Sequence, residues 1–345
     1  MFISPSGFGR GLIIALAASA VVGAAAYKLY GPTAGGSGET AEELTRTVEA
    51  ALEAVRKRDL TPSSTLRVTA TYDAVLAPLD KMLRLARNIA EGEKRDPAAD
   101  YDRIRAFVEP VIRLTALARD QARRESGPSK DYRFMEQKGE ACQLLAAALW
   151  NQLEARRRSS PAGRDGVRFV PEPADSERLY AILNDGLGAD PANKALWRLR
   201  GLVERANGLF GRAESDLRMA LNLDGQYAAA WNDLGLVLIN LRQFDEAGES
   251  FVKAKDQAAA AAKLAGRPLG PEYGAALLNL TEFHLSLADY YRRETGIDPA
   301  NRDNQDRLRF HLAGAADAAR ELVANLPPES PEAIEGQRLL SRITY

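Results

Sequence analysis

The side chains best suited to catalysis are scarce in this sequence. It contains two histidines, His284 and His311, and a single cysteine, Cys142. The histidines are 27 residues apart and neither lies in a metal-ligand spacing such as H-E-x-x-H. His284 follows Phe283 in an apolar helical pattern, and Cys142 has no histidine near it in sequence, so both are expected to be packed helix residues. We therefore predict no catalytic residue, no metal site and no cofactor.

Glycine and charge patterns point to no other chemistry. The glycines at 7, 9 and 11 lack the third spaced glycine of a dinucleotide fingerprint and precede an apolar run, so they are not such a site. The densest positive run is 156–158, with Arg164 and Arg168 nearby, and it is typical of cations at a helix C-terminus. An acidic partner or a lipid head group is the alternative for these arginines. A net charge of −1 gives no reason to expect a nucleic acid, and no small-molecule substrate is expected.

The N-terminal segment has the character of a membrane anchor. Residues 11–27 form a run of 17 residues without a charge, preceded by Arg10 and followed by Lys28. Such a helix is roughly 25 Å long, close to the about 30 Å of a bilayer core. We predict an anchor over residues 1–30, with the large domain on the extracytoplasmic, periplasmic side. A cleaved signal peptide ending near Ala24–Ala26 and a buried soluble helix are the alternatives.

A flexible linker is expected at 31–39, because the segment is rich in glycine and small polar residues. A helical region is expected at 40–158, either as degenerate repeats or as a separate bundle. Its first helix starts with a capping box, Thr40 and Glu43, and carries apolar residues at Leu44, Val48 and Leu52. The second helix is predicted over 72–90, the third from Asp96 with an interruption at Pro110, and the fourth over 131–156. Residues 159–173 are predicted to be a loop.

The most regular part of the chain is the stretch from Lys194 to Lys255. Six small or large apolar positions recur there at an offset of 34 residues. A period near 34 is the signature of a stacked helix-turn-helix array. The recurring pairs are Trp197 and Trp231, Gly201 and Gly235, Phe210 and Phe244, Ala213 and Ala247, Leu217 and Phe251, and Ala220 and Ala254.

This pattern resembles the tetratricopeptide repeat (TPR) family, with clear copies at 194–227 and 228–261. Small residues such as Gly235 and Ala247 suit the close crossing of two antiparallel helices, where a larger side chain would overpack. The first copy departs from the family at Arg200 and Glu204, and Gly225 replaces the usual closing proline. The two departures in the first copy are candidates for a specific contact.

Weaker copies flank the clear ones within a TPR-like domain at 174–345. A short helix at 175–187 is expected to pair with the fourth helix. A third hairpin is predicted from helices at 272–293 and 304–326, with a long connection at 294–303 and a final helix at 331–343 that covers the end of the stack. The predicted fold is all-α, a right-handed TPR-like helical-hairpin solenoid preceded by a helical N-terminal region and one N-terminal transmembrane helix.

The resemblance implies a protein-binding surface on the concave side of the stack. In the family this lining comes from the first helix of each repeat. Carrying those positions over places seven partner-binding candidates on this chain: Arg198, Leu202, Arg205, Asn232, Leu236, Ile239 and Asn240. Asparagine can bond a peptide backbone, and arginine can bond carboxylates. The alternative is that this face is only solvated, or covered by the chain's own N-terminal helices.

Together these observations predict a non-catalytic adaptor or assembly factor, a scaffold tethered to a membrane through residues 11–27. Its partners are expected to be proteins of the membrane or envelope, bound as a peptide or a helix on the concave TPR face. The alternative is a permanent structural subunit of a larger membrane complex. An enzyme with an unrecognised helical site would need polar groups that converge in a deep pocket.

Overall fold

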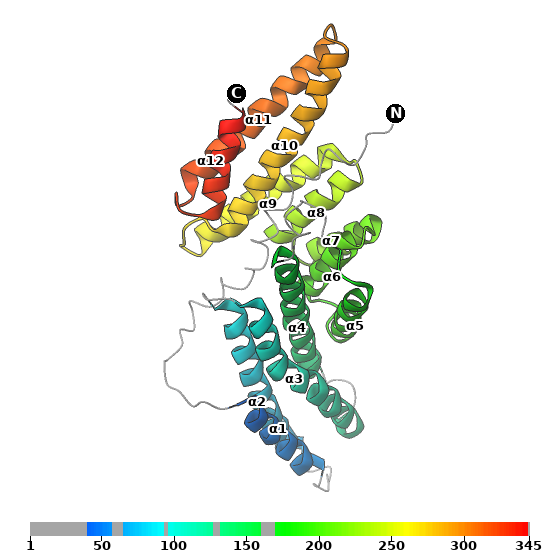
Figure 1. Ribbon diagram of the computed structural model, residues 1–345. Helices are drawn as coiled ribbons and strands as arrows, with labels where there is room; N and C mark the ends of the chain where they lie inside the picture. Colours follow the sequence, from blue (N-terminus) through cyan, green and yellow to red (C-terminus); the bar gives the residue numbers. More distant parts are fainter. Residues whose placement is uncertain (1–39, 57–64, 93–95, 127–131, 160–169, 344–345) are drawn as a thin grey trace. The chain divides into compact units, whose positions relative to one another are not determined.

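The computed structural model describes residues 40–56, 65–92, 96–126, 132–159 and 170–343. These ranges contain helices α1 to α12 and no strand, which confirms the all-α prediction (Figure 1). The chain divides into two compact units. The N-terminal unit holds α1 to α5 and α6 up to Val203, and the C-terminal unit holds the helical chain from Glu204 onward. The sequence-based domain boundary, between 158 and 174, stays a prediction.

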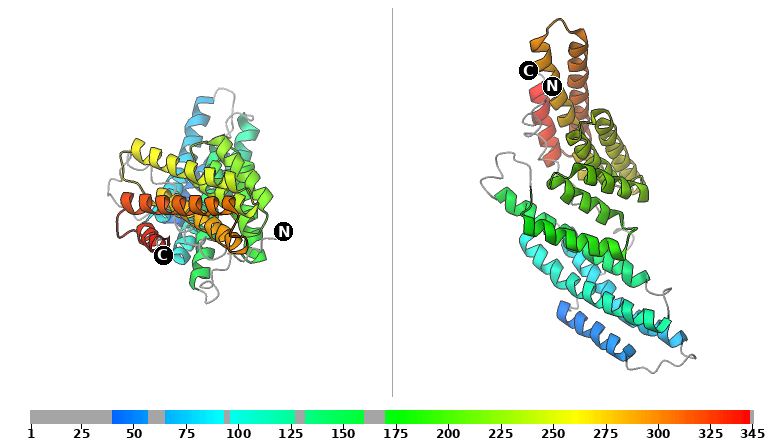
Figure 2. Two further views of the ribbon diagram at one scale, coloured as in Figure 1. Left: turned by 90° about the horizontal axis from the view of Figure 1, so that it is seen from above. Right: turned by 90° about the vertical axis from the view of Figure 1, so that its right-hand side faces the viewer.

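Four long or medium helices open the N-terminal unit: α1 (Ala41–Arg56), α2 (Thr65–Glu91), α3 (Pro97–Ser126) and α4 (Tyr132–Ser159). α1 begins with the predicted capping box. The N–H of Thr40 donates to Oε2 of Glu43 at 2.8 Å, and the N–H of Glu43 donates to Oγ1 of Thr40 at 3.2 Å. α2, α3 and α4 pack against one another, and the right-hand view of Figure 2 shows them side by side.

The predicted interruption of the third helix at Pro110 is wrong. α3 continues through Pro110 without interruption, and α2 begins at Thr65 and includes Pro78 well inside the helix. A proline removes one main-chain hydrogen bond and crowds the preceding turn. Packing outweighs that loss here, because fully buried Val108 and Val111 hold α3 on both sides of Pro110.

The fourth predicted helix pairs with the fifth, as expected. α5 (Pro173–Ala189) packs against α4 at Gly186, where an added Cβ would lie 2.7 Å from the Cβ of Cys142. Nζ of Lys138 is 2.5 Å from Oδ1 of Asp185 across the same contact. Cys142 is completely buried, so the predicted packing role of this residue is confirmed.

Two helical hairpins reproduce the 34-residue period. α6 (Lys194–Ala206) and α8 (Ala228–Asn240) begin 34 residues apart, and so do α7 (Phe210–Leu223) and α9 (Phe244–Leu264). The indole N–H of Trp197 donates to the main-chain oxygen of Pro191 at 2.8 Å, and that of Trp231 donates to Gly225 at 2.9 Å. Gly225 therefore provides the same main-chain acceptor as Pro191, its counterpart 34 positions earlier.

The C-terminal unit ends in a long antiparallel hairpin and a short helix. α10 (Pro271–Ile297) and α11 (Arg302–Asn325) run side by side, and α12 (Pro331–Ile343) packs against both (Figure 1). The connection between α10 and α11 is shorter than the predicted 294–303, because α10 continues to Ile297. At Gly336 of α12 an added Cβ would lie 2.5 Å from Cδ2 of Leu322, so α12 covers α11 closely, as the sequence predicts.

None of the helices in the described ranges combines the length and the apolar character of a bilayer span. The predicted anchor at 11–27 and the predicted linker at 31–39 lie outside the described residues. The anchor and its two alternatives therefore stay predictions.

Candidate functional site

The seven residues predicted to bind a partner lie on α6 and α8, and most of them are buried. Asn240 is exposed, and its Nδ2 donates to the main-chain oxygen of Leu236 at 2.7 Å. The other six side chains are between 1% and 8% exposed: Arg198, Leu202, Arg205, Asn232, Leu236 and Ile239. Partner binding by this set stays a prediction, and Asn240 is its one exposed member.

Asn232 has a contact inside the C-terminal unit. Nδ2 of Asn279 on α10 donates to Oδ1 of Asn232 on α8 at 2.9 Å, and both side chains are buried. Because a buried amide needs hydrogen-bond partners, this bond ties the first helices of two successive hairpins together. The carbonyl oxygen of Asn232 is therefore used in helix packing in this structure.

Arg200, a departure from the family pattern, has a local role in the N-terminal unit. Its Nη1 donates to Oδ1 of Asn184 on α5 at 3.0 Å, and its guanidinium carbon lies 4.7 Å from the centre of the Trp197 ring. The hydrogen bond joins α6 to α5, and the cation–π contact lies within α6. These contacts within the chain account for Arg200, so no binding partner is needed to explain it. Glu204 is buried, and its main-chain oxygen accepts the N–H of Leu209 in the following turn.

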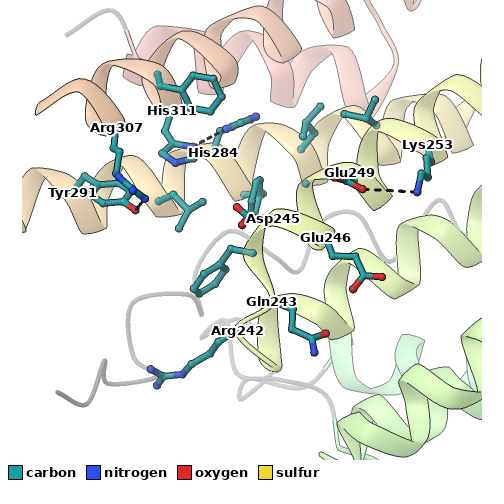
Figure 3. Close-up of a pocket in the computed structure, with 17 residues that line it drawn as sticks. Arg242, Gln243, Asp245, Glu246, Glu249, Lys253, His284, Tyr291, Arg307 and His311 are labelled. Atoms are coloured by element: carbon teal, nitrogen blue, oxygen red, sulfur yellow. Dashed lines mark hydrogen bonds and ion pairs between the residues drawn. The ribbon is translucent and has the colours of Figure 1, made fainter. Parts of the chain in front are cut away.

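A pocket of about 1030 Å³ lies in the C-terminal unit, where the first half of α9 faces α10 and α11 (Figure 3). Its floor is apolar, with buried Leu280, Phe283 and Leu287 of α10. Two large apolar side chains stay in solvent at its rim, Phe310 at 66% exposure and Val252 at 41%. We call this site the α9–α11 pocket. Its polar lining residues are Arg242, Gln243, Asp245, Glu246, Glu249, Lys253, His284, Tyr291, Arg307 and His311.

The two histidines of the sequence meet in this pocket. Nδ1 of His284 on α10 lies 3.0 Å from Nδ1 of His311 on α11, and Figure 3 shows the two rings facing one another. One ring must donate and the other accept in this bond, so the pair cannot be doubly protonated and keep it. Gly314 leaves the necessary space, because a Cβ there would lie 2.9 Å from Cε1 and Nε2 of His284.

Burial makes both imidazoles weak bases. Desolvation lowers the pKa of His284 to about 4, and the neighbouring His311 contributes to that lowering. Desolvation also lowers the pKa of His311, with a smaller contribution from the positive charge of Arg307. Both rings are therefore neutral near pH 7 and behave as aromatic, weakly polar groups.

Tyr291 and Arg307 complete the wall beside the histidines. The Tyr291 ring is stacked on His311, with 5.6 Å between ring centres and 5° between planes. Nη1 of Arg307 donates to the Tyr291 hydroxyl at 3.1 Å, and its Nε donates to Oδ2 of Asp303 at 3.0 Å. The charge of Arg307 is thus already paired with a carboxylate.

The opposite wall belongs to α9 and carries most of the acidic groups (Figure 3). Oε2 of Glu249 is 3.9 Å from Nζ of Lys253. Oε1 of Glu246 is 2.6 Å from Nη2 of Arg218. Asp245 is exposed and forms no ion pair with any residue that the structure describes. This wall therefore presents an excess of negative charge to the pocket.

The lining of the pocket has the composition of a binding site. In the described ranges no three His, Cys, Asp or Glu side chains are grouped as metal ligands. Cys142 belongs to the other unit, where burial raises the pKa of its thiol to about 12. An apolar floor with aromatic walls and a few charged groups is the usual composition of a binding pocket.

No local motif in the sequence indicates this pocket. The two histidines are 27 residues apart, a spacing that fits no local motif. They meet because α10 and α11 form an antiparallel hairpin, in which residues before and after the turn lie opposite one another. The predicted hairpin was the available signal, since His284 precedes the turn and His311 follows it.

Comparisons with known proteins give only distant likenesses. No protein-family model and no curated protein matches the sequence. TTC0263, a thermophilic TPR protein of Thermus thermophilus, is 20% identical over 67% of this chain and 99% of its own, with a TM-score of 0.32. Yeast Tom70 is 11% identical over 88% of this chain and 82% of its own, with a TM-score of 0.24. A chain of the APC/C hetero-tetramer Cut9–Hcn1 is 14% identical over 88% of this chain and 64% of its own, with a TM-score of 0.25.

Proposed function

We propose that this protein is a non-catalytic adaptor that binds a polypeptide partner and is tethered to a membrane by residues 11–27. The observation that carries the proposal is the α9–α11 pocket, an apolar cavity set in a scaffold of helical hairpins. Phe310 and Val252 remain in solvent at its rim although large apolar side chains are stabilised by burial. Exposed apolar groups around a cavity are typical of a surface that a partner covers.

Two surfaces are candidates for the partner. The first is the face of α6 and α8 that the TPR resemblance implies, of which Asn240 is exposed. The second is the α9–α11 pocket, whose rim side chains are exposed.

The membrane tether is supported by the sequence. The uncharged run at 11–27 is followed by a glycine-rich segment at 31–39, a combination that attaches a domain without fixing its orientation. On this proposal the helical units lie on the extracytoplasmic, periplasmic side, and the partners are membrane or envelope proteins.

Site-specific cross-linking in native membranes tests the proposal. A photoreactive residue replaces Asn240 in one variant and Phe310 in another, with Asp317 of α11, which does not line the pocket, as the control position. Discrete adducts with another protein at Asn240 or Phe310, and none at Asp317, are the expected result. Absence of protein adducts at both positions, together with normal function after deletion of residues 174–345, overturns the adaptor proposal.

A further inference from the structure

We propose that the α9–α11 pocket binds one kind of segment, an amphipathic helix of a partner protein whose apolar face is bordered by Lys or Arg side chains. The inference rests on the proposed adaptor function and adds the chemistry of the partner. It places the binding surface between the second helix of one hairpin and the following hairpin, and not on the face of α6 and α8.

The dimensions of the pocket fit a short helix. The α9 wall extends from Phe244 to Lys253. The nine steps between these two residues rise about 14 Å along the helix, which is two to three turns. The apolar floor of Leu280, Phe283 and Leu287 offers one stripe of contacts over that length. A helix that lays an apolar face into such a groove uses anchors at i, i+3 or i+4, and i+7.

The charge of the α9 wall favours basic side chains along the edge of the bound helix. The α9 wall has three acidic residues, Asp245, Glu246 and Glu249, and one basic residue, Lys253. Lys253 pairs with Glu249, and Arg218 of α7 is shared between Glu246 and Glu214, whose Oε1 is 2.9 Å from its Nη2. A partner helix with Lys or Arg along the edge that faces α9 neutralises this excess, whereas an acidic edge would meet Asp245 with like charge.

The wall formed by α10 and α11 does not repel a basic helix electrostatically. Arg307 is bonded to Asp303 and to the Tyr291 hydroxyl, so its charge is already compensated. The histidine pair adds no positive charge near pH 7, because burial lowers the pKa of both rings. Arg242 lies in the turn before α9, at the end of the wall, where it faces the end of a bound helix and not its length.

The space above the floor depends on Gly248 of α9. A Cβ there would lie 3.1 Å from Cε1 of Phe283, so the absent side chain lets the aromatic floor approach α9. The equivalent residue of the preceding hairpin, 34 positions earlier, is Glu214. The pocket is thus a feature of this hairpin and not a general property of the repeat.

The binding test uses the full-length protein in detergent and two synthetic peptides of 14 residues each (about four helical turns). Both peptides carry Leu at the same i, i+3, i+4 and i+7 positions. One is bordered by Lys and the other by Glu, and binding is measured by fluorescence anisotropy. We expect the Lys-bordered peptide to bind about fivefold more tightly, which is the scale of one exposed charge pair.

Three variants assign that preference to the pocket. Asp245→Lys should abolish the roughly fivefold preference, and Phe310→Ser should weaken the binding of both peptides. Asp317 is also an exposed aspartate on a helix, but it lies outside the pocket. Asp317→Lys should therefore change neither the preference nor the affinity for the two peptides. Circular dichroism of each variant checks that it is folded.

Equal binding of the two peptides, or the same effect from Asp245→Lys and Asp317→Lys, overturns the inference. In that case adducts at Asn240 in the membrane would leave the adaptor function standing with another binding surface. If neither Asn240 nor Phe310 forms a protein adduct and deletion of residues 174–345 has no effect, the proposed function itself fails, so the two failures can be told apart.

Discussion

Arg242 in the α8–α9 turn has the left-handed backbone conformation that Gly208 has in the α6–α7 turn, with φ angles of 63° and 79°. The two residues are 34 positions apart, and their main-chain bonds match. The N–H of Gly208 donates to Arg205 and that of Arg242 donates to Ile239, both at 3.1 Å. The same helix-ending turn is therefore built once with glycine and once with a residue that has a Cβ.

Arg242→Gly is expected to raise the free energy of unfolding by about 0.5–1 kcal/mol, because glycine adopts this conformation without steric strain. Urea denaturation measures the change, and the reverse substitution Gly208→Arg should lower stability by a similar amount. A loss of stability in Arg242→Gly would contradict the prediction, because it would mean that contacts of the Arg242 side chain outweigh the strain.

Gly235→Ala is expected to destabilise the protein by about 1–3 kcal/mol through overpacking. An added Cβ would lie 2.6 Å from Cε1 of the fully buried Phe251, where α8 crosses α9. Gly211→Ala is the matched control, because a Cβ there meets nothing within 4 Å, and alanine should stabilise α7 by up to about 1 kcal/mol. Equal effects of the two substitutions in thermal or urea unfolding would show that the crossing at Gly235 tolerates a methyl group.

The histidine pair should make stability fall in acid. The folded-state pKa of His284, about 4, lies below the ordinary value of 6.5, so the unfolded chain binds the proton of this residue more readily. The stability that depends on neutral His284 is fully present above pH 6.5. It is lost as the pH falls towards 4, because the unfolded chain takes up the proton first. Allowing for the partial exposure of the ring, we expect a loss of about 2 kcal/mol over that range.

His284→Gln isolates this effect, because it removes the titrating ring while the carboxylates that also titrate in acid remain. Urea unfolding from pH 4 to pH 7 should show a smaller pH dependence in the variant than in the wild type. Parallel stability curves for the two proteins would contradict the assignment to His284.

Cys142 is expected to be inert in the folded protein. It is fully buried beside Gly186, and burial raises the pKa of its thiol to about 12, so almost no thiolate is present at pH 8. A thiol reagent such as dithionitrobenzoate should modify it only after denaturation. Rapid modification of the native protein would mean that the α4–α5 contact opens readily.

Local patterns in the sequence predicted local structure well. The capping box of Thr40 and Glu43 starts α1 as expected, and the recurrence of Trp197 as Trp231 marked the hairpins with their correct period. These features depend on residues a few positions apart, or on a repeated unit. Pro110 was misjudged because the packing of Val108 and Val111 that keeps α3 continuous depends on other helices.

The candidate site could not be predicted in the same way. The meeting of His284 and His311 requires both the pairing of α10 with α11 and the rotation of each helix about its axis. The positions of the two helices in the sequence predict that they pair. They do not predict which side of each helix faces the other. The seven residues carried over from the TPR pattern were placed on the expected helices, yet the pattern gave no indication that all but Asn240 would be buried.

The length of α9 breaks the 34-residue period. α9 has 21 residues where α7 has 14, and α10 consequently begins 43 residues after α8 begins. A duplicated 34-residue unit inserted between Tyr227 and Ala228 would keep the period of the two regular hairpins. The same unit inserted before Pro271 would follow a helix that is out of step with it. We therefore expect an inserted 34-residue unit to match the period at the first joint and not at the second, because the long α9 precedes the second joint.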